Sequence, residues 1–174
     1  MNGLIGAVLP GFSQMPNIHP MVVHFPIALL GAFVAMELLG LLTGSDGVRA
    51  AGSWMLYLGA LGAAVAVIAG LHAAGTVAHT DAVHAIIERH EGFGISVLVL
   101  ASGLSLWRLA VRARFSARAR AAHIAVAVVM VALMALGADL GGLMVYGHGV
   151  GVKAAQTTPA APAPGHVHDH THSH

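Results

Sequence analysis

The stretch HPMVVHFPIALLGAFVAMELLGLL, residues 19–42, is long and apolar enough to cross a lipid bilayer as one helix. A hydrocarbon core of about 30 Å takes about 20 helical residues, each of which rises about 1.5 Å. Three later stretches have the same character, at about residues 51–75, 82–111 and 121–146. The sequence therefore predicts an all-α fold, a polytopic membrane bundle of four helices.

The composition excludes several classes of protein. Of the 174 residues, 57% are hydrophobic and 9% are charged, whereas a soluble domain carries about a quarter charged residues. The absence of cysteine excludes disulfides, iron–sulfur clusters, thiolate zinc sites and covalently attached c-type haem. The net charge of +1 leaves no basic surplus for a nucleic acid. We therefore expect membrane lipid, and no nucleic acid, as a partner.

The distribution of apolar residues divides the chain into three segments. Residues 1–18 are expected to form an interfacial lead-in, residues 19–152 a four-transmembrane-helix domain, and residues 153–174 a disordered tail that is Pro/Ala-rich and then His-rich. Arginines gather after the first and third spans, at Arg49 and in residues 108–120. By the positive-inside rule these loops are cytoplasmic, so both termini are expected to lie outside.

Histidine is unusually frequent, with 13 in the chain. The alternating direction of the four helices is expected to place all of them except His123 toward the outer face. From His24, His90 and His148, helical steps reach mostly slender residues. A slim apolar groove capped by imidazoles suits a haem b, whose iron takes two axial nitrogens, although closely packed helices produce the same pattern. The candidate cofactor ligands are His24, His90, His148 and His72.

Two further groups have the chemistry of metal ligands. His84 and Glu88 lie one helical turn apart at the start of the third span, although a solvated polar face gives the same spacing. The tail segment HVHDHTHSH alternates imidazoles, which bind copper, nickel or zinc. The candidate metal ligands are His19, His84, Glu88, His166, His168, His170, His172 and His174.

A carboxylate near the end of the fourth span is expected to support such a site. Asp139 lies about 10 Å inside the span, where a charge is costly unless it faces the bundle or water. Asp139 shares a helical face with Gly142 and Tyr146, so it is expected to orient a ligand histidine or to serve a proton path. A hydrogen bond that only fixes packing is the alternative. The supporting residues are Asp139, Tyr146, Gly141 and Gly142.

The first span also holds two prolines and a carboxylate. Pro20 or Pro26 is expected in the first helical turn, where a missing N–H costs nothing. A helix that begins upstream of Pro26 would instead bend beside His24. Glu37 is expected to pair with Arg108 or to extend toward the membrane interface.

Two motifs resemble a known family. HPMVVHFPIALL at residues 19–30 and GGLMVYGHGVGV at residues 141–152 are similar to the paired signatures of the bacterial family called domain of unknown function 2231, small four-helix membrane proteins. The likeness spans about residues 18–152 and implies a multi-pass protein of the bacterial inner membrane. Some members are joined to Rieske-type or cytochrome c-type modules, which implies work near electron transfer. The resemblance selects His19, Pro20, His24, Phe25, Pro26, His90, Gly141, Gly142, Tyr146, His148, Gly149 and Gly151.

Three functions fit these observations. The leading hypothesis is a non-catalytic protein that binds haem b or a metal at its periplasmic face and exchanges electrons with a periplasmic or membrane redox protein. The alternatives are copper or divalent-metal handling with the His-rich tail, and a structural subunit of a respiratory assembly. A homo-oligomer is compatible with all three. No catalytic residue is proposed, because no hydrolytic or phosphate-binding motif is present, and four helices without internal repeats leave little space for a large solute.

Overall fold

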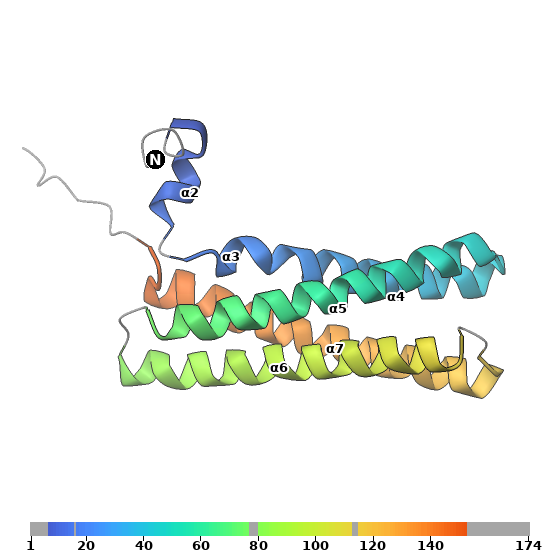
Figure 1. Ribbon diagram of the computed structural model, residues 1–174. Coiled ribbons are helices and arrows are strands. Elements are labelled where there is room, and N and C mark those ends of the chain that lie inside the picture. Colours follow the sequence, from blue (N-terminus) through green and yellow to red (C-terminus); the bar gives the residue numbers. More distant parts are fainter. Residues whose placement is uncertain (1–6, 16, 77–79, 113–114, 153–174) are drawn as a thin grey trace, which may run out of the picture.

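The computed structural model describes residues 7–15, 17–76, 80–112 and 115–152 (Figure 1). Within them four stretches are long and apolar enough to cross a membrane, so the predicted all-α membrane bundle is confirmed. The elements are α2 (Pro10–Gln14), α3 (His19–Val22), α4 (His24–Thr43), α5 (Asp46–Ala74), α6 (Asp81–Ala110), α7 (Ala117–Gly142) and the π-helical turn η1 (Leu143–Gly147).

The long helices form two antiparallel hairpins, α4 with α5 and α6 with α7 (Figure 1). The hairpins lie side by side, and α5 packs on α6, whereas α4 touches α7 only lightly. Because the helices alternate in direction, one end of the bundle carries His19 and His90, and the other carries Arg49 and Arg108. We call these the histidine end (left in Figure 1) and the arginine end.

The second span begins earlier than predicted. The turn-forming residues after the first span are expected to be a loop as far as residue 47, but α5 starts at Asp46. Ser45 accepts a hydrogen bond from the backbone N–H of Val48, and Asp46 lies in the first turn. A serine cap and an acidic first turn stabilise a helix N-terminus, which explains the earlier start.

The first span is interrupted at Val23, between α3 and α4. Pro20 lies in the first turn of α3, as predicted for one of the two prolines. Pro26 is the third residue of α4, and it has no N–H to donate to the carbonyl of Val22. The helical hydrogen-bond pattern is therefore broken between α3 and α4, at Val23 and next to His24.

The apolar core lies between the two ends of the bundle. All four spans contribute to it, and most of its members are fully enclosed. Its buried residues are Leu30, Phe33, Leu56, Val97, Ala101, Leu104, Ala127 and Met130.

A buried ion pair joins the two hairpins at the arginine end. The Arg108 guanidinium donates to Glu37 Oε1 at 2.6 Å, and the two side chains are 2% and 3% exposed. The predicted pairing of Glu37 with Arg108 is therefore confirmed. Arg108 also donates to the backbone carbonyl of Arg49 at 3.2 Å. Gly52 leaves room for the carboxylate, because a Cβ there would lie 3.2 Å from Glu37 Oε1.

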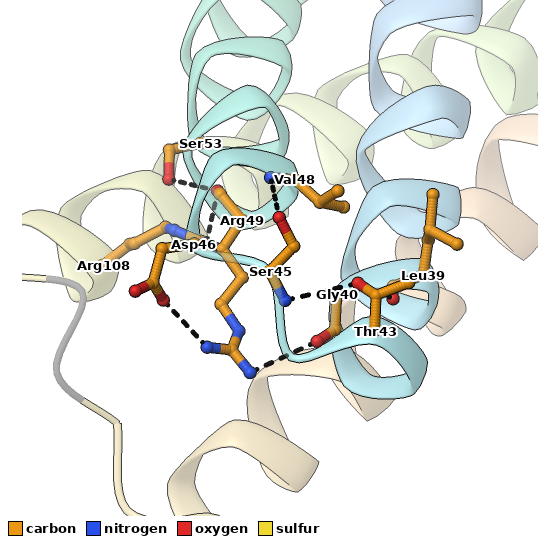
Figure 2. Close-up of polar contacts among 9 residues, drawn as sticks. All are labelled: Leu39, Gly40, Thr43, Ser45, Asp46, Val48, Arg49, Ser53 and Arg108. Atoms are coloured by element: carbon orange, nitrogen blue, oxygen red, sulfur yellow. Dashed lines mark hydrogen bonds and ion pairs between the residues drawn. The ribbon is translucent and has the colours of Figure 1, made fainter.

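Arg49 closes the turn between α4 and α5 (Figure 2). Its guanidinium contacts Asp46 at 3.0 Å and the carbonyl of Gly40 at 3.2 Å. Thr43 accepts a hydrogen bond from the Ser45 N–H. These contacts hold the first hairpin in place beside Arg108.

We predict that removing one charge of the buried pair is costly. Arg108→Met or Glu37→Gln should lower the free energy of unfolding by about 3–5 kcal/mol, because each leaves an unpaired group in the interior. The double variant Glu37→Leu with Arg108→Met should retain more stability than either single variant. Thermal unfolding in detergent, followed by far-UV circular dichroism, measures this, with exposed Arg112→Met as the control. Wild-type stability of Arg108→Met would contradict the prediction.

A second prediction concerns the close approach of α4 and α5. A Cβ at Gly59 would lie 2.6 Å from Leu30 Cδ2 and 2.8 Å from its Cγ, whereas Gly103 faces open space. Gly59→Ala should therefore cost about 1–3 kcal/mol through overpacking, and Gly103→Ala should cost nothing similar. The same unfolding measurement tests both variants. Equal losses of stability in Gly59→Ala and Gly103→Ala would contradict a close approach of α4 and α5 at Gly59.

Candidate functional site

Two histidines from different hairpins meet inside the histidine end. His19 begins α3 and His90 lies in α6. Their ring centroids are 5.9 Å apart, and the ring planes are nearly perpendicular, at 86°. Each ring is half-buried. The expected cofactor ligand His90 therefore lies beside His19, which is expected from the sequence to bind a metal.

Both imidazoles are held by a backbone carbonyl of a neighbouring helix. His19 Nδ1 lies 3.0 Å from the carbonyl oxygen of Ala66, and His90 Nδ1 lies 2.8 Å from that of Gly137. A carbonyl only accepts, so each Nδ1 carries the proton and donates it. This fixes the tautomer and leaves a lone pair on each Nε2, which has no hydrogen-bond partner among the described residues. Ligand histidines in metal sites are oriented in this way.

A glycine lies next to the ring one turn after each carbonyl, and only at Gly70 would a Cβ be too close to the imidazole. A Cβ at Gly70 would lie 2.9 Å from His19 Cε1, and a Cβ at Gly141 would lie 3.5 Å from His90 Cε1. The expected slim face that leads back from His148 through Gly141 and Gly137 therefore packs against the imidazole of His90. Ala66, Gly70 and Gly137 were not among the predicted site residues, because the equal spacing of each histidine from its carbonyl is visible only in the folded bundle.

The pair lines an apolar cavity of about 660 Å³. Alanines and glycines form much of its wall, and all four spans contribute lining residues. A volume of several hundred cubic ångströms holds a cofactor-sized ligand. Besides His19 and His90, the polar side chains at its wall are few and include His24, Glu91 and Tyr146.

The other expected cofactor ligands do not contact the pair, although His24 lies at the wall of the same cavity. His24, His72 and His148 are exposed, and within the described residues no hydrogen bond or ring contact joins any of them to His19 or His90. His24 Nδ1 contacts only the carbonyl of Met21, at 3.4 Å. Their roles as ligands remain predictions.

The expected supporting residues divide into two groups. Gly141 and Gly142 line the cavity. Asp139 is exposed, and Tyr146 is 92% exposed in η1 at the rim. Across the described segments, no hydrogen bond joins Asp139 to Tyr146 or to a histidine, so the proton path stays a prediction.

The expected metal ligands on α6 form an exposed pair. His84 Nε2 lies 3.4 Å from Glu88 Oε1, and both side chains are more than half exposed. In the part of the chain that the structure describes, no three histidine, aspartate or glutamate side chains are placed to hold one metal ion. His166, His168, His170, His172 and His174 lie outside the described residues.

His123 lies toward the arginine end, as expected. Its buried ring donates from Nε2 to the carbonyl of Leu104 at 3.3 Å. The rings of Phe33, Trp107 and Phe115 surround it. This environment is that of a packed core residue.

The comparison with protein families agrees with this fold. The family described as "Predicted membrane protein (DUF2231)" matches residues 15–154. The chain is therefore a member of the DUF2231 family of membrane proteins, as the two sequence motifs indicate. Neither the curated proteins nor the solved structures give a match.

We predict that His19 ties α3 to α5. His19→Ala removes the hydrogen bond to the Ala66 carbonyl, which should cost about 0.5–1.5 kcal/mol of unfolding free energy. His24→Ala is the matched control, because that imidazole is exposed and its contact with Met21 is long. Thermal unfolding of the purified protein compares the two variants. A larger loss in His24→Ala would contradict the assignment.

Proposed function

We propose that this membrane protein binds a haem b through His19 and His90 and takes part in electron transfer at the histidine end of the bundle. The proposal rests on one observation: two imidazoles, each fixed through Nδ1 on a backbone carbonyl, share the wall of an apolar cavity.

The number of donors favours a haem. Structural zinc takes four protein ligands and catalytic zinc takes three, but the described residues offer no group of three such side chains. A haem iron takes only one or two protein ligands, because the macrocycle supplies the other nitrogens, so His19 and His90 would be enough to hold it. The centroids of the two rings lie 5.9 Å apart, so one ligand could reach both imidazoles.

The environment also suits an apolar cofactor. Small residues such as Ala63, Ala66 and Gly94 form much of the wall, so the cavity can accept a flat, apolar group. Haem b would supply a one-electron couple there, and the apolar wall would keep water away from it. His19 and His90 hold their Nε2 lone pairs for a ligand, and the two carbonyls keep these rings in orientation.

The location and partner belong to the same proposal. The arginine end carries Arg49, Arg112, Arg118 and Arg120, which by the positive-inside rule favours a cytoplasmic position for that end and a periplasmic position for the histidine end in a bacterial inner membrane. The electron partner is then a periplasmic or membrane redox protein.

Absorption spectra test the proposal. Protein from haem-replete cells, purified in detergent, should show a Soret band and an α band that sharpens on reduction. His19→Ala and His90→Ala should lose most of this absorbance. His24→Ala and His148→Ala, at exposed positions, should retain it.

Metal analysis of the same sample separates the alternatives. Iron that matches the porphyrin content supports the proposal. Copper or zinc without porphyrin would replace it with metal handling. Absence of both from wild-type protein, or loss of absorbance in His24→Ala and not in His90→Ala, would overturn the assignment of the ligands.

A further inference from the structure

The two histidine contacts are related by a constant shift along the chain. Each joins a histidine to a carbonyl 47 residues further on, His19 to Ala66 and His90 to Gly137. The second contact lies 71 residues after the first, which is also the separation between Glu37 and Arg108. The glycines under the rings, Gly70 and Gly141, obey the same shift.

The start of the second helix in each hairpin follows the same shift. The second helix of each hairpin begins at Asp46 or at Ala117. Each is capped by a serine, Ser45 or Ser116, whose hydroxyl accepts from the N–H three residues later. When the first hairpin is aligned on the second with a shift of 71 residues, the alignment needs no insertion or deletion from His19 to the end of α5.

Burial repeats as well. Every buried residue of α7 is the counterpart of a buried residue of α5, and four buried positions of α4 match four of α6. The matched pairs are Pro26 and Val97, Leu30 and Ala101, Phe33 and Leu104, Glu37 and Arg108, Gly52 and His123, Leu56 and Ala127, Gly59 and Met130, and Ala66 and Gly137.

These relations indicate an approximate local two-fold axis, from which the bundle departs in that α5 packs on α6 more extensively than α4 packs on α7, the counterpart interface. Both hairpins start at the histidine end, so the axis runs along the bundle. A residue that contacts its own counterpart lies at such an axis. His19 contacts His90 at one end, and Glu37 contacts Arg108 at the other. The axis therefore passes through the histidine pair and the buried ion pair.

We propose that the bundle is a duplicated helical hairpin and that its ligand lies on the local two-fold axis, with one equivalent imidazole from each half. The ligand is then a centre with two equivalent coordination positions, such as a haem iron. Ala66 with Gly70, and Gly137 with Gly141, are equivalent positioning pairs for the two rings. The identity of the ligand rests on the function proposed above, whereas the duplication does not.

The ion pair shows where the halves have diverged. Two identical hairpins would bring two carboxylates or two guanidiniums together at the axis, and such a buried like-charge pair is strongly unfavourable. Glu37 on one half and Arg108 on the other remove this conflict. Gly52 and His123 are also counterparts, and each suits the charged residue beside it. Gly52 leaves room for the Glu37 carboxylate, and the His123 imidazole packs near Arg108.

Exchange of charges in the full chain tests the symmetry without any ligand. Glu37→Arg and Arg108→Glu should each lower the unfolding temperature strongly, and the double exchange should recover most of the loss, because the positions are equivalent. If the double variant does not fold, adding Gly52→His and His123→Gly also exchanges the residues beside the two charges. This fourfold variant should fold and recover most of the unfolding temperature. No recovery in either combination would overturn the duplication.

Haemin titration in detergent tests the equivalence of the ligands. His19→Gly and His90→Gly should each weaken binding beyond the about 10–100-fold that a lost outer partner costs. The two losses should agree within about threefold, and added imidazole should restore both. Unchanged affinity in one variant would overturn the shared site. If wild-type protein binds no haemin, the proposed function and the ligand part of this inference fail, and the charge exchange still decides the duplication.

Discussion

The structure depends on the requirement that polar groups within an apolar bundle find partners inside it. Water is absent from the hydrocarbon core, so an unpaired group there costs several kcal/mol. Glu37 meets this requirement with Arg108, and His19 and His90 meet it with backbone carbonyls. These contacts join α3 to α5, α6 to α7 and the first hairpin to the second. They also fix which imidazole nitrogen is left for a ligand, so the same constraint shapes both the fold and the site.

The sequence predicts the architecture well because the relevant signals are strong and local. Length and hydropathy define each span, and the unlike charges of Glu37 and Arg108 toward the same end of the first and third spans indicate their pairing. The early start of α5 depends on one cap, Ser45, within a run of turn-forming residues. The partner of His90 was harder to identify, because helix periodicity gives a direction on one helix and not the rotation of its neighbours. His24 is close to His19 in sequence, yet it is exposed while His19 turns inward.

The two halves share little sequence identity, for a physical reason. Apolar spans exchange Leu, Ala, Val and Met freely when the total volume is kept, so counterparts such as Leu56 and Ala127 show no identity. Some positions with a specific task keep their residue, as do the histidines at the axis and the serine caps. At the axis itself, Glu37 and Arg108 had to become unlike. The constant shift of 71 residues therefore emerges from contacts rather than from similarity.

A membrane bundle with one imidazole from each half on a common axis has a direct spectroscopic signature. Electron paramagnetic resonance of the oxidised, haem-loaded protein measures the axial ligands of the iron. The account predicts a low-spin ferric signal of two imidazole ligands in wild-type protein, which changes to high spin in both His19→Gly and His90→Gly. A low-spin signal that persists in either variant, or a high-spin signal in wild-type protein, would contradict the shared site.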